Sequence, residues 1–323
     1  MAKTSSVQIG LSGDVATMPH ILAAITKKVH DLGGDDFVEG SSATKIVTRA
    51  GLNIMKISDM PPKVFVLMGQ EAYLYPTENI GEVFKVPLAE SSRSITVEVL
   101  SHSPQLLIVR NFLAPSECED VIKAATPKME PSTVLKQGDQ TSGENKVRDS
   151  VRTSSTAWMM DRNVPIVKAL RERTEELMGA QNDWTEDLQV LRYEPKQHYH
   201  VHTDYFDPKL YANDKRWAAG HNRLATVFFY LTTVEEGGQT VFPYGNTRKE
   251  DFARVHAYGR CEDALPTALK VPAVQGNAII FYSLKAKGHL RGELDPTSLH
   301  GGCDPIKGTK WAANLWIRNG PKL

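Results

Sequence analysis

The spacing of apolar residues near the start of the chain predicts one amphipathic helix followed by short extended segments. The apolar positions share the period of one helix face and are Met18, Ile21, Leu22, Ile25, Val29 and Leu32. Thr17 can cap this helix, and Gly33-Gly34 ends it. Three short apolar runs follow at residues 54–57, 64–68 and 83–86, separated by glycine and proline. Residues 1–90 are therefore predicted to form a small α/β extension, and their sequence contains no motif that indicates its role.

From residue 91 onward the pattern changes to that of a mainly β domain with supporting helices. Ser116 and Glu119 have the spacing of a capping box and predict a helix that runs to Ala125, while Asn163 and Gly179 bracket a second helix. The strand-like runs are residues 95–99, 106–109, 188–193, 225–231, 240–242, 278–282 and 311–317. Helices followed by many short strands indicate a sandwich or jelly roll on which the helices pack. Residues 137–145 are expected to form a mobile loop, and residues 206–222 and 244–268 are expected to surround an active site.

The overall composition is that of an ordinary globular protein and argues against several classes of partner. The 323 residues include 38 basic and 38 acidic side chains, so no excess charge attracts nucleic acid or an anionic membrane. No apolar run is long enough for a signal peptide or a membrane span, which predicts a cytoplasmic location. The 3 cysteines are too few for a disulfide framework. Cys261 and Cys303 are therefore expected to be reduced thiols, with a disulfide between them as the alternative.

A cluster of histidines in the predicted β domain indicates a metal site. In the run His198-Tyr199-His200-Val201-His202-Thr203-Asp204, residues 198, 200, 202 and 204 share a face if the run is a strand. His202 and Asp204 are adjacent on that face and can meet one ion, whereas His198 and His200 are more simply explained as partly buried histidines. The third ligand must come from elsewhere in the fold, and His300 precedes the last predicted strand. Two imidazoles and one carboxylate with open coordination positions make the facial triad of non-heme Fe(II) oxygenases.

From about Ser94 to Ile317 the chain resembles the prolyl 4-hydroxylase family, especially its plant and algal members. The matching segments are Asn111-Phe112-Leu113, Glu117-Cys118-Glu119, Pro131-Ser132-Thr133-Val134, Val151-Arg152-Thr153-Ser154-Ser155, Gln189-Val190-Leu191-Arg192-Tyr193, His202-x-Asp204-Tyr205-Phe206, Arg223-x-Ala225-Thr226, Glu236-Gly237-Gly238-Gln239-Thr240-Val241-Phe242-Pro243, Asp295 to His300, and Lys310-Trp311. This ordered series is far more specific than the His-x-Asp tripeptide alone. The resemblance implies that residues 91–323 have a double-stranded β-helix core. It also implies dependence on Fe(II), 2-oxoglutarate and O₂, with ascorbate as reductant.

The resemblance also implies roles for individual residues. His202, Asp204 and His300 would be the catalytic residues that bind Fe(II). Lys310 would pair with the distal carboxylate of 2-oxoglutarate, and the helpers of this co-substrate site would be Tyr193, Thr240 and Trp316. The reaction would release succinate and CO₂ and oxidise an unactivated C–H bond. A binding module that keeps this fold without the chemistry is the alternative from another class, and the intact triad with Lys310 argues against it.

The positions that flank the substrate in the family are mostly retained here, as Arg152, Trp158, Glu186, Tyr199 and Arg223. They favour hydroxylation of prolyl residues in a proline-containing peptide. Two positions depart from the family, because Thr156-Ala157 stands where a glycine is usual and Arg318 stands where a histidine is usual. A guanidinium is a good clamp for a carboxylate. The alternative substrate is therefore a small amino-acid-like molecule, a free acid that is hydroxylated or closed into a ring by a radical step, as in kainoid-type specialised metabolism.

Overall fold

The computed structural model describes residues 17–32, 43–51, 53–62, 64–68, 72–75, 77–88, 94–135, 146–147, 150–209, 211, 222–255, 259–285 and 293–320. The loop predicted at residues 137–145 lies outside this set, as does most of the loop predicted at 206–222. Within the described residues, no helix is both long and apolar enough to cross a membrane.

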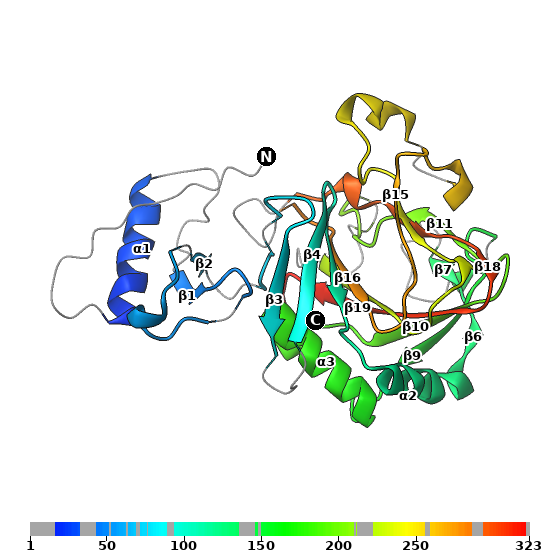
Figure 1. The fold of residues 1–323 in the computed structure, drawn as a ribbon, viewed down its shortest axis with the longest axis horizontal. Coiled ribbons are helices and arrows are strands. Elements are labelled where there is room, and N and C mark those ends of the chain that lie inside the picture. Colours follow the sequence, from blue (N-terminus) through cyan, green and yellow to red (C-terminus); the bar gives the residue numbers. More distant parts are fainter. Residues whose placement is uncertain are drawn as a thin grey trace.

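The N-terminal part of the chain forms a small unit beside the main body (Figure 1). Helix α1 (Met18–Leu32) packs on a two-stranded antiparallel sheet of β1 (Ala43–Val47) and β2 (Phe65–Met68). Its own small core consists of Ile21, Ile25, Ala43, Ile46 and Ile54. The predicted helix is therefore confirmed, and its apolar stripe faces the strands because that is the only apolar surface within reach.

The segment that follows this unit joins the large core of the protein. Tyr73 and Tyr75 are buried in that core, and the hydroxyl of Tyr75 donates to the Leu177 carbonyl at 2.8 Å. Strand β3 (Val83–Pro87) then pairs with β4 (Ser94–His102) as the edge strand of the large sheet. The division of the chain at residue 90 remains a prediction, although residues on both sides of it build one sheet.

Two facing sheets form the main body, and they confirm the predicted jelly roll. The large sheet has 9 strands in the order β3-β4-β5-β16-β12-β19-β10-β9-β6, and the small sheet has 4 in the order β11-β17-β14-β15. The remaining strands of the large sheet are β5 (Gln105–Arg110), β6 (Glu130–Pro131), β9 (Ser155–Met159), β10 (Leu188–Tyr193), β12 (Arg223–Tyr230), β16 (Ala278–Tyr282) and β19 (Lys310–Arg318). Those of the small sheet are β11 (Tyr199–His202), β14 (Thr240–Phe242), β15 (Leu269–Val271) and β17 (His300–Gly302). Short two-residue or three-residue ladders pair β7 (Val134–Leu135) with β8 (Lys146–Val147) and β13 (Glu236–Gly237) with β18 (Pro305–Lys307).

Each strand of the large sheet presents one face to the helices and the other to the small sheet. On β19, Ala313, Leu315 and Ile317 belong to the core under α2 (Pro115–Ala125) and α3 (Pro165–Met178). The alternate residues Lys310, Ala312, Asn314 and Trp316 therefore face the small sheet, because successive side chains of a strand point to opposite sides. The face toward the small sheet is where polar groups gather.

Both helices begin one or two residues away from the predicted positions. The cap of α2 is Ala114 and not Ser116, and Glu117 Oε2 accepts the Ala114 N–H at 2.7 Å. The cap of α3 is Val164 and not Asn163. In each case a proline follows the cap, because the first helical residue needs no N–H and the ring fixes a helical φ. The predicted end of α3 is confirmed, since Gly179 adopts φ 60°.

Candidate active site

Three predicted metal ligands converge where the small sheet faces the large one. Strands β11 and β17 are neighbours, and His202 and His300 are register partners. One ligand atom from each of His202, Asp204 and His300 lies within 4.8 Å of the other two. The Nε2 atom of His202 is 3.7 Å from Asp204 Oδ1, and that of His300 is 3.6 Å from Asp204 Oδ2. The fold thus brings together residues that are almost one hundred positions apart in the chain.

Hydrogen bonds orient all three side chains toward the common point. Nδ1 of His202 lies 2.9 Å from the His200 carbonyl, and Nδ1 of His300 lies 2.9 Å from the Ser298 carbonyl. A carbonyl can only accept, so each Nδ1 carries the proton and each Nε2 keeps a free lone pair. Asp204 Oδ2 accepts from the Thr226 hydroxyl at 2.6 Å and from Trp316 Nε1 at 3.0 Å.

The surroundings keep these groups in the protonation states that metal binding requires. Burial, assisted by the neighbouring His300, lowers the pKa of His202 to about 3. Burial acts to raise the pKa of Asp204, but His300, His202, Arg223 and the Thr226 hydroxyl together lower it below its usual value. Two neutral imidazoles and one carboxylate on one side of a point are a donor set that fits Fe(II) and leaves coordination positions open.

The two other histidines of the cluster turn away from this point. The His198 ring stacks on His200 with centroids 5.0 Å apart, and its Nδ1 lies 3.7 Å from Asp304. The expectation that residues 198 to 204 alternate regularly is wrong, because the β11–β17 register shifts between Tyr199 and His202. As a result Tyr199, an odd-numbered residue, stacks on His202 at 3.8 Å.

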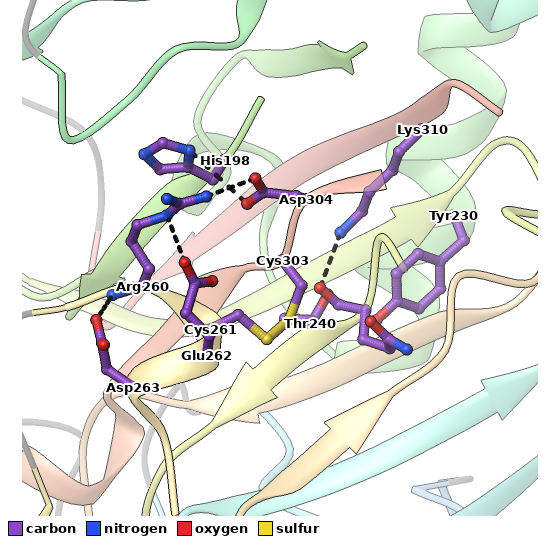
Figure 2. The surroundings of a disulfide bond; sticks show 11 residues. His198, Tyr230, Thr240, Arg260, Cys261, Glu262, Asp263, Cys303, Asp304 and Lys310 are labelled. Atoms are coloured by element: carbon purple, nitrogen blue, oxygen red, sulfur yellow. Dashed lines mark hydrogen bonds and ion pairs between the residues drawn. A yellow bond between two sulfur atoms is a disulfide. The ribbon is translucent and has the colours of Figure 1, made fainter. Parts of the chain in front are cut away.

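Lys310 lies deep between the two sheets within a set of aromatic rings. Its Nζ is 5.5 Å from the Tyr193 ring centroid, 5.4 Å from that of Phe228 and 5.7 Å from that of Tyr230. Among the described residues its hydrogen-bond partner is the Gln239 carbonyl at 3.5 Å, and no carboxylate pairs with it (Figure 2). Burial lowers the pKa of Lys310 to about 7. A buried amine of this kind gains most from an anionic partner.

Two members of this aromatic set were not predicted from the sequence. The Tyr230 hydroxyl donates to Thr240 Oγ1 at 2.9 Å, which places the predicted Thr240 beside Lys310 in Figure 2. Tyr230 and Phe228 both belong to β12, whose apolar run resembles ordinary core. Their register partners on β19 are Ala312 and Asn314, so pairing with the strand of Lys310 is the signal that identifies them.

Trp316 touches the metal carboxylate and links it to residues predicted to flank the substrate. Its indole donates to Asp204, the Arg223 guanidinium lies 3.6 Å over its ring, and the Trp158 ring is 5.9 Å away. Arg223 is held by Glu186 through two hydrogen bonds of 2.9 and 2.8 Å. Its charge is therefore compensated within the protein.

The other predicted substrate residues also lie close to the metal ligands. The Arg152 guanidinium lies 4.6 Å over the Tyr199 ring, which itself stacks on His202. Arg318 is buried and is the register partner of Arg223. Trp158 is 38% exposed, so this side of the site opens to solvent.

Cys261 and Cys303 form a disulfide, so the expectation of reduced thiols is wrong and the alternative is confirmed. Cys303 follows β17 directly, and Cys261 begins a short 3-10 helix (Cys261–Asp263), which brings the two Cα atoms within 5.0 Å although 42 positions separate them. Next to the disulfide, Arg260 pairs with Asp304 at 2.6 Å (Figure 2). The Cys303 N–H also donates to the Gln239 carbonyl that Lys310 contacts. The disulfide thus braces the strands that carry His300 and Thr240.

Comparison with known proteins adds relatives over most of the main body. Residues 188–318 match the model of the 2OG-Fe(II) oxygenase superfamily. The chain is 39% identical over 224 residues to probable prolyl 4-hydroxylase 3 of Arabidopsis thaliana, covering 69% of this chain and 72% of that one. It is 35% identical over 227 residues to prolyl 4-hydroxylase 1 of the same plant, covering 70% and 72%. Among solved structures, the viral collagen prolyl hydroxylase of Paramecium bursaria Chlorella virus-1 in its 2OG complex is 25% identical with a TM-score of 0.45, covering 66% of this chain and 95% of that one.

Proposed function

Because the chain belongs to the prolyl 4-hydroxylase family of Fe(II)- and 2-oxoglutarate-dependent dioxygenases, we propose that it hydroxylates prolyl residues in a proline-containing peptide. The observation that carries the proposal is the set of neutral and anionic donors of His202, Asp204 and His300, next to a buried lysine without a carboxylate partner. The reaction converts 2-oxoglutarate and O₂ to succinate and CO₂ while the substrate C–H bond becomes C–OH.

In this proposal the triad holds the iron and its neighbours hold the triad. His202 and His300 offer Nε2, and Asp204 offers the carboxylate whose Oδ2 is already fixed by Thr226 and Trp316. When bound, Fe(II) supplies the activation of O₂ that side chains lack. The two carbonyl partners at Nδ1 keep both rings in the tautomer that presents a lone pair.

Lys310 binds the distal carboxylate of 2-oxoglutarate, assisted by Tyr193 and Thr240. The surrounding rings exclude water, which strengthens a charge-assisted hydrogen bond between ammonium and carboxylate. Trp316 lies at the other end, against Asp204, and limits how the co-substrate can lie between the two.

The substrate side is formed by Trp158, Tyr199 and Arg152, with the Glu186–Arg223 ion pair behind Trp316. Aromatic rings suit the flat, apolar ring of a prolyl residue, and Arg152 can bond to a peptide carbonyl. The five family positions retained here support a peptide more than the two departures weaken it.

A second candidate is oxidation of a free, acidic, amino-acid-like molecule, by hydroxylation or by kainoid-type radical ring closure. The observation that favours it is Arg318, a buried residue next to Arg223 in the register of β19 and β12, where the family has histidine. Two neighbouring guanidinium groups attract carboxylates. The cytoplasmic location remains a prediction, and the disulfide argues against it because disulfides persist mainly in oxidising compartments.

The test offers the enzyme, with Fe(II), 2-oxoglutarate and ascorbate, a panel of proline-rich peptides and a panel of free proline-like or N-alkylated glutamate-like acids. Substrate-dependent succinate and the product mass are measured by mass spectrometry. The proposal predicts a gain of 16 mass units on peptides (the mass of one oxygen atom). Turnover of a free acid with none on peptides would establish the second candidate instead.

A further inference from the structure

A buried pair of side-chain amides lies on the face of the large sheet that carries the active site. Gln189 on β10 and Asn314 on β19 are register partners, and they are 4% and 9% exposed. Asn314 Nδ2 donates to Gln189 Oε1 at 3.2 Å. In the part of the chain that the structure describes, this is the only hydrogen bond of either side chain, so one donor and one acceptor stay unused.

The chemistry of this pair does not depend on how the two amides are oriented. If both are flipped, Gln189 donates to Asn314, and the unused groups are again one NH₂ and one carbonyl. Two bonded primary amides therefore always present a donor beside an acceptor. Burying such groups without partners is costly, which points to a ligand that supplies both.

The neighbours of the pair place it between the co-substrate anchor and the metal carboxylate. Asn314 precedes Trp316 by two residues on the same face, and Trp316 donates to Asp204. In the other direction Phe228, the register partner of Asn314, lies against Lys310. Ala312, between Lys310 and Asn314 on this face, leaves room because its side chain is a methyl group. The half-exposed Trp158 is the register partner of Gln189, so solvent and substrate reach the pair from that side.

We propose that Gln189 and Asn314 recognise one amino-acid unit of the substrate through an N–H donor and an adjacent carbonyl or carboxylate oxygen. The inference rests on the proposed function, because it concerns how that substrate is held. In a peptide the two groups are the carbonyl of the prolyl residue and the N–H of the residue after it. In a free proline-like acid they are the ammonium N–H and the carboxylate oxygen. The pair is neutral and therefore accepts either source.

The experiment replaces the pair by side chains of the same shape, Gln189→Met with Asn314→Leu. Removing both partners of a buried hydrogen bond is nearly neutral for stability, so the double variant should fold with a Tm close to that of the wild type. The KM of the peptide should rise about 10- to 100-fold, the effect of two lost hydrogen bonds. Gln275→Met is the matched control, since Gln275 is also a partly buried amide but donates to the Leu231 carbonyl away from the site. Its KM should equal that of the wild type.

A modified peptide identifies the group that is recognised. N-methylation of the residue after the proline removes the N–H, and it should lower kcat/KM about 10-fold in the wild type but not in the double variant. Equal loss in both enzymes, or an unchanged peptide KM in the folded double variant, would overturn the inference. If the wild type accepts only free acids, the proposed function fails, and the double variant must then raise the KM of the acid by the same factor for the inference to stand.

A second variant covers the case in which the double variant does not fold. Asn314→Asp keeps a hydrogen bond to the Gln189 amide and leaves only oxygens unused, so the donor is lost. The peptide KM should rise, and the KM of an anionic free acid should rise further because of the added negative charge. A peptide KM equal to that of the wild type contradicts the inference.

Discussion

Raising the pH above 7 should weaken the binding of 2-oxoglutarate, because the proposed carboxylate anchor then loses its proton. Burial lowers the pKa of Lys310 in the free enzyme to about 7. The distal carboxylate pairs only with the charged amine, so the complex holds the proton and has a higher pKa. Between pH 7 and pH 9 the charged fraction in the free enzyme falls from one half to about one hundredth. The apparent Kd should therefore rise about 50-fold across this range.

The assay is calorimetric titration of 2-oxoglutarate into enzyme that carries a redox-inert divalent metal. At pH 8, binding should take up close to one proton, and the uptake is measured by repeating the titration in buffers of different ionisation enthalpy. The matched ligand is 2-oxobutyrate, which has the same chelating end but lacks the distal carboxylate. Its affinity should not follow the ionisation of Lys310. The matched variant is Lys310→Met, which should bind 2-oxoglutarate weakly and without proton uptake.

Two results would refute this reasoning. One is a Kd for 2-oxoglutarate that stays constant between pH 7 and pH 9. The other is the same pH dependence for 2-oxobutyrate, which would trace the effect to the metal ligands. In either case another cation, with Arg223 or Arg318 as the next candidates, would have to hold the distal carboxylate.

Three further predictions concern the triad, the ion pair and the disulfide. Asp204→Ala should abolish succinate release and sharply reduce bound iron measured after desalting, and turnover in this variant would contradict the proposed ligand set. Glu186→Ala leaves the buried Arg223 guanidinium unpaired and should lower the free energy of unfolding by about 3–5 kcal/mol in urea titrations, whereas a loss below about 1 kcal/mol would show that water replaces the carboxylate. Replacing Cys261 and Cys303 by serine opens a loop of 42 residues and should cost about 4 kcal/mol on the chain-entropy model. Dithiothreitol should produce the same shift of the unfolding midpoint in the wild type, and an unchanged midpoint under reducing conditions would argue that the disulfide adds nothing to stability.

The strands that sequence predicted best are those buried on both faces. Residues 240–242 and 278–282 were predicted with the bounds that β14 and β16 have, because every residue in them is apolar or small and the flanking turns are clear. Strand β12 begins two residues earlier than predicted, at Arg223. An arginine ends an apolar run in sequence, but here Glu186 neutralises it and the strand continues.

The features that sequence could not predict depend on pairing between distant segments. The disulfide requires Cys261 to lie beside the end of β17, and nothing near either cysteine encodes that distance. The stacking of Tyr199 on His202 results from a register shift that alternation cannot foresee. Gln189 and Asn314 each look like an ordinary polar residue in a strand, and only the β10–β19 register makes them a pair.

The most direct test of the central claim follows labelled oxygen through one reaction. The enzyme is incubated with Fe(II), 2-oxoglutarate and a proline-rich peptide under ¹⁸O₂, and both products are weighed by mass spectrometry. A dioxygenase of this family should place one labelled atom in succinate and one in the hydroxylated peptide, with equal amounts of the two products. Succinate that forms at the same rate without the peptide, or a peptide product that carries no label, would contradict the account.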